Sequence, residues 1–431
     1  MYPPGWLPSA PVSANTQGVP SDCVQARIWI MDSPMGYYIF LRIGNTFPYT
    51  IDDWKRAHSS CSIPVITLAA SKNIDAFALD MGVDSWQPER VSDAYKAAIG
   101  TSFKLFLSFD MGSLPCSTPS DGDLLRQLIQ GYSGRSNQLT YNGKCSFGTE
   151  HMDEGWWNVL KTTMTGVDVH FVPAFFMEPP IFPNLNSIDG AFSMTIDSSY
   201  DDEYLTYLPG RTYMAGVSPW FFTHYSEKTH NKNLLYRSDD WLYVSRWENL
   251  IAYRNVIDLV QIISWNDYGE SHYIGPIDGA QPMSESWTTG FDHQGWLDVT
   301  QYYATTFKTD VYPAIEKDRV FLWGRLYPAG ANAPDGVGKP LNSEYDYVWG
   351  LVFLTSPPHV DLGCGVHHEA VELPAGANKV KLSLLGVDDC AVTTTISRNG
   401  RSVLDFRPEQ YRFRKNPPRY NFNALVVSSL R

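Results

Sequence analysis

The chain has 431 residues, a length that suggests one large and one modest domain. Hydrophobic residues make up 43% and charged residues 18%, the balance of an ordinary folded protein, so disorder throughout the chain is not expected. The formal net charge of −13 argues against nucleic acid and against anionic membrane surfaces as partners, because both attract basic proteins.

Residues 1–36 are rich in Pro, Ser and Gly and are assigned no element. Their start, MYPPGWLPSAPVSANTQG, has no basic n-region and no apolar h-region, so as written it is not a signal peptide. Beyond them, short apolar runs alternate with stretches in which apolar residues recur at helical spacing. The candidate strands are residues 37–43, 76–79, 104–109, 143–147, 170–175, 190–194, 212–217 and 259–264.

Helical spacing of apolar residues predicts helices within 88–100 and 238–255, and Gly100 is a suitable end for the first. Strands that alternate with helices over about 300 residues predict an α/β fold, a TIM-type (β/α)8 barrel at 37–330. An open doubly wound sheet is the structural alternative.

The pattern changes after a segment rich in Pro, Gly and Ala, and we expect a linker at 331–344. Short alternating runs follow, and Asn399-Gly400 is a strong hairpin signal. These features predict a small accessory β-sandwich at 345–431.

The cysteines and the histidine pair suggest no metal centre. The six cysteines include no Cys-x-x-Cys, although Cys364 and Cys390 fall in the same C-terminal region and could pair. The segment VHHE at 366–369 is better explained as a solvated turn than as a metal site. The chain also has no Gly-x-Ser-x-Gly, no P-loop and no dinucleotide fingerprint.

Carboxylates follow three of the candidate strands, at the strand ends where a barrel of this kind carries its chemistry. Asp80 and Asp110 each precede Met-Gly, and Asp267 is followed closely by Glu270. An acid in such a place can also cap the next helix or form an Asx turn. That simpler explanation applies most readily to Asp80 and least to Asp267 with Glu270.

The segment WNDYGESHYIG at 265–275 gathers two carboxylates, a histidine and three large rings. Cleavage of a glycosidic bond needs one carboxylic acid to protonate the leaving oxygen and one carboxylate to activate water or attack the sugar. Aromatic residues, 14% of the chain, suit the flat faces of sugars. The spacing in sequence does not decide between retention and inversion.

Five segments together resemble fungal α-1,3-glucanases, the mutanases of glycoside hydrolase family 71. The similarity extends from about residue 37 to 330 and is looser beyond. The segments are GNTFPYT at 44–50, IDAFALDMG at 74–82, KLFLSFDMG at 104–112, VSPWFFTHY at 217–225 and WNDYGESHYIGP at 265–276.

The resemblance implies endo-type hydrolysis of α-1,3-glucan with inversion at the anomeric carbon, without a cofactor, by a secreted or cell-wall enzyme that we expect to be a monomer. The residues that it marks as catalytic are Asp110, Asp267 and Glu270, with the acid and the base among the last two left open. The residues expected to line the sugar site are Trp220, His224, Asn266, His272, Tyr273 and Asp80.

The sequence departs from the family at residues 57–66, where Pro64 is expected to break the first helix. We therefore expect this stretch to bulge out as a loop after the first strand or to displace the start of the first helix. Its deletion should keep the fold and raise thermal stability or activity. The family also has Asn where this chain has Asp80. Because of such departures, a catalytically impaired α-glucan-binding paralogue and a glycosidase for another linkage both remain alternatives.

Overall fold

The computed structural model describes most of the chain, and the residues divide into two compact units. Unit 1 comprises Met1–Val217 and Arg246–Ile263, and unit 2 comprises Ser218–Ser245 and Ser264–Arg431. The described residues are 23–27, 36–42, 63–111, 114–115, 118–141, 144–147, 149–151, 154–174, 177–195, 198–228, 231–236, 241–277, 283–337 and 346–429.

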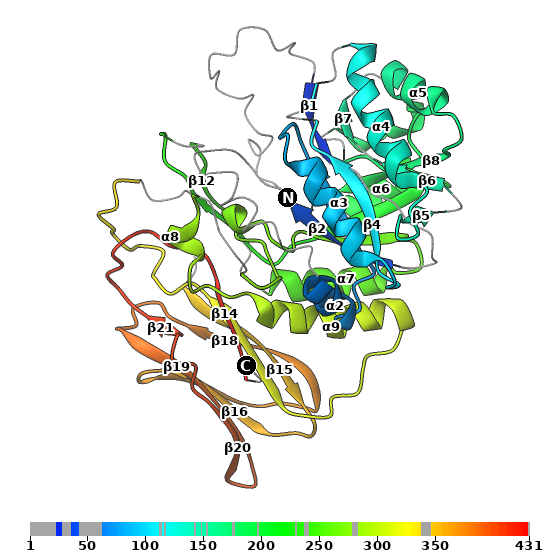
Figure 1. Ribbon diagram of the computed structural model, residues 1–431. Coiled ribbons are helices and arrows are strands. Elements are labelled where there is room, and N and C mark those ends of the chain that lie inside the picture. The colour runs from blue at the N-terminus through cyan, green and yellow to red at the C-terminus, as the bar shows by residue number, and fades with distance from the viewer. Residues whose placement is uncertain are drawn as a thin grey trace. The chain divides into compact units, whose positions relative to one another are not determined.

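Unit 1 is built on parallel strands (Figure 1). Its largest sheet has the order β4-β3-β2-β13-β10-β9, with every neighbouring pair parallel. These strands are β2 (Gly36–Arg42), β3 (Ala76–Met81), β4 (Lys104–Phe109), β9 (Gly190–Ser193), β10 (Thr212–Val217) and β13 (Leu259–Ile262). The smaller sheets contain β5 (Thr140–Tyr141), β6 (Lys144–Phe147) and β8 (Val169–Phe171), and β1 (Cys23–Arg27) with β7 (Thr149–His151).

Helices connect the parallel strands, which makes the fold a mixed α/β fold. They are α2 (Ile63–Ser71), α3 (Gln87–Ala98), α4 (Gly122–Ser133), α5 (Glu154–Thr163), α6 (Ser199–Tyr207) and α7 (Leu242–Ala252), with the 3₁₀ turns η1 (Pro119–Asp121) and η2 (Pro179–Asn184). Each of the eight stretches expected to form strands contains one, and α3 and α7 confirm the two expected helices. Gly100 follows α3 with a φ of 81°, as its place at a helix end requires.

Burial explains why these segments adopt their structures. All six residues of β3 and of β10 are buried, as in parallel strands that are covered on both faces. In α3 the apolar residues Val91, Ala94, Tyr95 and Ala98 are buried at helical spacing, so one stripe of the helix packs inward. The core of the unit is a cluster to which β3, β4, β9, β10 and β13 all contribute.

The expectation of a loop is wrong for residues 63–66, while the alternative of a displaced helix start stays a prediction. Helix α2 begins at Ile63 and includes Pro64, while 57–62 lie outside the described residues. Proline is tolerated in the first turn of a helix, where its missing N–H has no partner to lose. Val65 and Ile66 are 4% and 1% exposed, so deleting 57–66 would remove core residues and lower stability.

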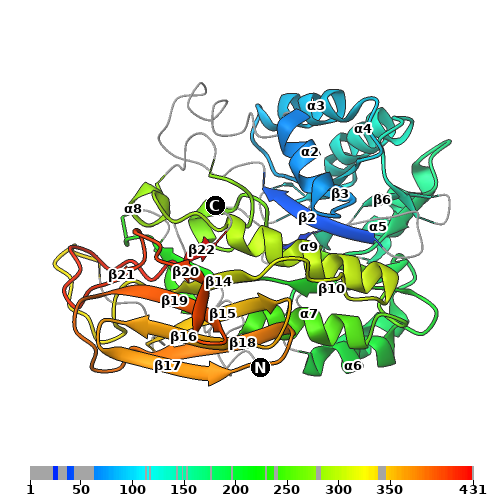
Figure 2. The ribbon, with the colours of Figure 1, turned by 90° about the horizontal axis from the view of Figure 1, so that it is seen from below.

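Unit 2 contains two larger antiparallel sheets, whose strands Figure 2 shows running alongside one another. The first has the order β18-β15-β14-β22, and the second includes β17-β16-β19-β20 with β21 beside β19. Their strands are β14 (Arg319–Gly324), β15 (Tyr347–Leu354), β16 (His359–Cys364), β17 (His367–Glu372), β18 (Gly376–Ser383), β19 (Cys390–Arg398), β20 (Arg401–Phe406), β21 (Arg412–Phe413) and β22 (Leu425–Ser428).

One hydrophobic cluster draws residues from both sheets, among them Val320, Val352, Leu362 and Ile396. Strand β14 pairs with β15 in this sheet, although β14 lies before the expected linker at 331–344 in the sequence. The domain boundaries expected from the sequence stay a prediction. The remaining elements of the unit are the hairpin β11 (Phe221–His224) with β12 (Asn233–Tyr236), the turn η3 (Tyr268–Glu270), and the helices α8 (Glu285–Thr288) and α9 (Gln294–Thr309).

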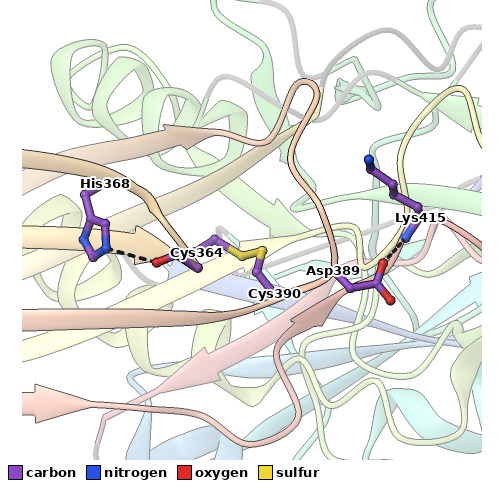
Figure 3. Close-up of a disulfide and its surroundings, with 6 residues drawn as sticks. Cys364, His368, Asp389, Cys390 and Lys415 are labelled. Atoms are coloured by element: carbon purple, nitrogen blue, oxygen red, sulfur yellow. Dashed lines mark hydrogen bonds between the residues drawn. A yellow bond between two sulfur atoms is a disulfide. The ribbon is translucent and has the colours of Figure 1, made fainter.

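Two local predictions are confirmed in these sheets. Cys364 and Cys390 form a disulfide between the neighbouring strands β16 and β19 (Figure 3). Asn399 and Gly400 form the turn between β19 and β20, both with positive φ, as the hairpin requires. Among the described residues, no helix is long and apolar enough to cross a membrane.

Candidate active site

The segment that follows β13 folds into a compact loop fixed by its first residue, Ser264. The backbone N–H of Ser264 donates to the carbonyl of His272 at 2.8 Å, and the Ser264 carbonyl accepts from Ile274 at 3.0 Å. The Ser264 hydroxyl oxygen also accepts the N–H of Asp267 at 2.9 Å and lies 3.0 Å from Nδ1 of His272. One buried serine thus holds both the carboxylate segment and the histidine.

Asp267 and Glu270 are brought together by the short turn η3. Asp267 is its N-cap, and Oδ1 of Asp267 accepts the N–H of Glu270 at 3.2 Å. Ser271 then adopts the left-handed conformation with a φ of 63°, and its hydroxyl donates to the carbonyl of Phe222 at 2.8 Å. This turn reverses the chain, so that both carboxylates and His272 lie on one side of it.

His272 lies beside both carboxylates. Its Nε2 is 2.9 Å from Oε2 of Glu270 and 3.6 Å from Oδ2 of Asp267. The side chains of Asp267 and His272 are 3% and 4% exposed, whereas that of Glu270 is 16% exposed. The arrangement places two carboxylates and an imidazole in a poorly solvated cluster, where interactions between charges are stronger than in water.

A cation that the sequence reading missed completes the cluster. Nζ of Lys232 contacts Oε1 of Glu270, and the same ammonium lies 5.3 Å from the centre of the Phe221 ring. Lys232 lies just before β12, in the hairpin that β11 begins. Its position in the sequence, between two asparagines, gave no signal of this contact, because the hairpin alone brings it to Glu270.

Two glycines of the loop are required by close packing. A side chain at position 269 would place its Cβ 2.3 Å from the hydroxyl of Tyr225, and one at position 275 would meet the Trp265 ring at 2.6 Å. Tyr225 follows β11 and packs edge-on against Trp287, with ring centres 4.9 Å apart. The glycines therefore let the loop approach its aromatic neighbours.

A second layer of polar contacts lies behind the loop. Tyr273 is fully buried, donates from its hydroxyl to the carbonyl of Phe291, and accepts from Nδ2 of Asn423 at 3.2 Å. Burial raises the pKa of Tyr273 well above its ordinary value, so the hydroxyl stays protonated. His293 stacks on the Tyr273 ring at 3.9 Å, and burial lowers the pKa of His293 to about 4, which keeps it neutral.

Three further residues expected at the sugar site have defined contacts in unit 2. Trp220 is 1% exposed and donates from Nε1 to the carbonyl of Phe422 at 3.0 Å. Nε2 of His224 lies 3.1 Å from Oδ2 of Asp335, a residue in the expected linker. Asn266, 7% exposed, belongs to the loop itself. Direct contact of these residues with sugar stays a prediction.

Asp80 and Asp110 belong to unit 1. Asp80 is 4% exposed at the end of β3, and its Oδ1 accepts from the hydroxyl of Ser108 at 2.8 Å. Asp110 follows β4 and is partly buried, and its N–H donates to the carbonyl of Met81 at 2.8 Å. Both carboxylates thus follow or end parallel strands as expected, and their roles in catalysis and binding stay predictions.

Among the described residues, one group could hold a metal ion. It consists of Asp267, Glu270 and His272, each of which offers a ligand atom within 4.8 Å of the others. The Glu270 carboxylate of this group already contacts the ammonium of Lys232. That contact already supplies positive charge at one of the two Glu270 oxygen atoms. The chemistry of the cluster suits acid and base catalysis by carboxylates.

The profile of glycosyl hydrolase family 71 matches residues 37–431. The glucan endo-1,3-alpha-glucosidase agn1 of Schizosaccharomyces pombe is 33% identical over 89% of this chain and 92% of its own. The mutanase Pc12g07500 of Penicillium rubens is 30% identical over 91% of this chain and 88% of its own. A solved GH99 endo-alpha-mannosidase of Bacteroides thetaiotaomicron, 13% identical, aligns over 63% of this chain and 97% of its own with a TM-score of 0.47.

Proposed function

The chain belongs to glycosyl hydrolase family 71, and on that premise we propose that it is an endo-acting hydrolase of α-1,3-glucan. The observation that carries the proposal is the poorly solvated cluster of Asp267, Glu270 and His272, which provides two carboxylates at one site. Two relatives that match about nine-tenths of the chain are named for this substrate or as a mutanase. We further propose that the enzyme acts as a monomer on wall or external glucan.

The proposed architecture is a (β/α)8 barrel followed by a β-sandwich. The N–H of Leu139 donates to the carbonyl of Leu105 at 2.8 Å, which joins β4 to the chain that leads into β5. The N–H of Phe192 donates to the carbonyl of Pro173 at 2.7 Å, which joins the segment after β8 to β9. With β2 paired to β13, and β6 paired antiparallel to β5 and parallel to β8, these bonds support a closed ring in which β5 joins the eight expected strands. The hydrophobic cluster that the two C-terminal sheets share supports the sandwich.

The proposed catalytic residues are Asp267 and Glu270 as the acid–base pair, with Asp110 as a third carboxylate. Glycosidases generally place two carboxyl groups on either side of the bond to be cleaved, and Asp267 and Glu270 would supply such a pair. We propose that His272 orients the two acids that it contacts. The residues proposed to bind the sugar are Trp220, His224, Asn266, His272, Tyr273 and Asp80.

The proposed stereochemical outcome rests on the family resemblance. The family resemblance favours inversion, for which the two carboxyl groups are separated by about 6.5–9.5 Å, whereas retention uses about 5–5.5 Å. We propose inversion, and the anomer released first, followed by ¹H NMR during hydrolysis, decides between the two.

The proposed activity is tested by reducing-sugar release from alkali-treated α-1,3-glucan, with α-1,4-, β-1,3- and β-1,4-glucans as a comparison panel. We expect release from the α-1,3-linked polymer above all others. A pull-down on the same polymer accompanies the assay. Binding without release would show an inactive glucan-binding protein, and release from another polymer would overturn the proposed linkage.

A further inference from the structure

Lys232 is held in place by its surroundings rather than left to move freely on the surface. Its carbonyl accepts the N–H of Tyr225 at 2.9 Å, which fixes the backbone at the loop end of the β11–β12 hairpin. Its ammonium lies 5.3 Å from the centre of the Phe221 ring, within the range of a cation–π contact. The side chain is 39% exposed, so its stem is partly covered while its charge reaches Glu270.

The two oxygens of Glu270 have different partners. Oε1 contacts the ammonium of Lys232, and Oε2 lies 2.9 Å from Nε2 of His272. Both contacts place a potential donor on a carboxylate oxygen, and together they fix the rotation of the carboxyl group. Contacts with donors also favour the charged form of a carboxylate over the protonated form.

We infer that Lys232 is a positioning residue for the proposed hydrolysis, one that aims the Glu270 carboxylate and sets the pH at which Glu270 gives up its proton. The inference rests on the proposed function, since it concerns the titration of one of the proposed acid–base pair. The chemistry is that of a fixed cation beside a catalytic carboxylate. The ammonium touches Glu270, and it acts through that residue.

The sign of the effect follows from electrostatics. Removing a positive charge beside a carboxylate makes ionisation less favourable, so the carboxyl group releases its proton at higher pH. The limb of the pH–rate profile that Glu270 controls must therefore move to higher pH. If Glu270 is the base, the acidic limb moves, and if Glu270 is the acid, the alkaline limb moves. The limb that shifts thus assigns the role of Glu270 as well.

The experiment measures kcat and KM against pH for the full chain and for Lys232→Met and Lys232→Arg, with α-1,3-glucan oligosaccharides as substrate. Lys232→Met keeps much of the length and apolar character of the stem and removes the charge. We expect kcat to fall by less than the roughly 10²–10⁴-fold of a lost acid–base group. One limb should rise by about half a pH unit or more, a modest shift because the lysine is partly solvated. Lys232→Arg keeps the charge, so this variant should retain most of the parent kcat and most of the parent limb position.

Lys415→Met is the matched control, because Lys415 forms an exposed pair with Asp388 in the same unit at 2.5 Å. It should leave the rate and the pH profile as they are in the parent protein. A Lys232→Met variant with the parent profile, or an Arg variant as impaired as the Met variant, would overturn the inference. Failure of the proposed function is distinguishable, because the parent protein itself would then release no sugar from α-1,3-glucan.

If Lys232→Met melts well below the parent protein, Lys232→Gln and the Arg variant take its place. A limb shift in the Gln variant that the Arg variant reverses would still support the role in titration. Equal losses of stability in Gln and Arg variants without any shift of a limb would mean that Lys232 acts only in folding, and the inference would be wrong.

Discussion

Two histidine–carboxylate pairs in unit 2 have the same contact distance and very different surroundings. Nε2 of His272 lies 2.9 Å from Oε2 of Glu270 in the loop after β13, and Nδ1 of His368 lies 2.9 Å from Oδ1 of Asp361 on β16 and β17. The side chains of the first pair are 4% and 16% exposed, and those of the second are 47% and 36% exposed.

The comparison indicates that a histidine at hydrogen-bonding distance from a carboxylate is not enough to make a catalytic site. In the loop, a second carboxylate, a lysine and a buried serine surround the pair, so its charges interact with little screening. On the outer face of β16 and β17, water screens the pair and its contact is worth little. We therefore expect changes in the loop to alter rate, and changes in the sheet to alter stability.

The largest effect is expected from the loop carboxylates themselves. Asp267→Asn and Glu270→Gln should each lower kcat by about 10²–10⁴, the scale of one acid–base group. Both variants should keep the circular dichroism and melting behaviour of a folded protein, because the replacements are close in size. Initial rates on α-1,3-glucan measure the loss.

Asp361→Asn makes the corresponding change in the exposed pair and serves as the control. It should leave kcat within about twofold of the parent value, since an exposed pair is worth roughly 0–1 kcal/mol. Full activity in both loop variants, or equal losses in the loop and sheet variants, would remove the distinction between the two pairs.

A smaller effect on rate is expected from the packing behind the carboxylates. In Gly269→Ala the new Cβ would lie 2.3 Å from the Tyr225 hydroxyl, so the loop must shift. A displacement of about 1 Å at such a site can cost on the order of 10² in rate. A lower kcat with an unchanged melting temperature would show that the variant loses the alignment of the loop carboxylates and not the fold.

Tyr225→Phe tests the same contact from its other side. It removes the clashing hydroxyl, and the nearest remaining ring atom would lie 3.4 Å from the new Cβ. The double variant Gly269→Ala with Tyr225→Phe should therefore recover much of the activity that Gly269→Ala loses. A double variant as impaired as Gly269→Ala would show that the glycine acts through some other contact.

The disulfide offers the opposite outcome, a loss of stability without a loss of rate. Replacing Cys364 and Cys390 together by Ser opens a loop with a sequence separation of 26, which should cost roughly 2–4 kcal/mol in unfolding free energy. Hydrogen exchange should quicken in β16 and β19, while kcat at 25 °C stays as it was. A large fall in kcat in a variant that is still folded would contradict the division between loop and sheet.

Much of the fold could be predicted from the sequence because burial leaves a pattern. The runs at 76–81 and 212–217 are apolar enough to show strands covered on both faces, and Asn399-Gly400 specifies its own turn. Pro64 was misread, because a proline breaks a helix only beyond the first turn and the pattern did not show where α2 begins. Element ends depend on a few local contacts that composition does not reveal.

The carboxylates of the site could be predicted from the sequence, whereas their partners could not. Asp267, Glu270 and His272 are neighbours in sequence, so a loop necessarily keeps them close. Lys232, Asn423 and Asp335 come from distant segments, and only the fold brings each to the loop or to His224. Long-range polar contacts of this kind have no periodicity, so no reading of one sequence could have found them.

The smallest expected effect is a pH dependence of stability from the exposed pair. A hydrogen bond to Asp361 raises the pKa of His368 above its ordinary value of 6.5. A raised pKa in the folded state gives stability that is complete below the ordinary pKa and is lost as the pH rises through the raised pKa. The unfolding free energy of the parent protein should therefore decline slightly from pH 6 to 8.5 by this contribution, which solvent screening keeps small.

His368→Gln removes this titration, so chemical denaturation at pH 6 and 8.5 should show a smaller decline for the variant than for the parent protein. The rate on α-1,3-glucan should not change at either pH, because the pair lies on β16 and β17 and not in the loop. A decline of the same size in both proteins would show that water already screens the pair completely. A change in rate would mean that the outer face of these strands takes part in the reaction, and burial would then no longer separate the two histidine–carboxylate pairs.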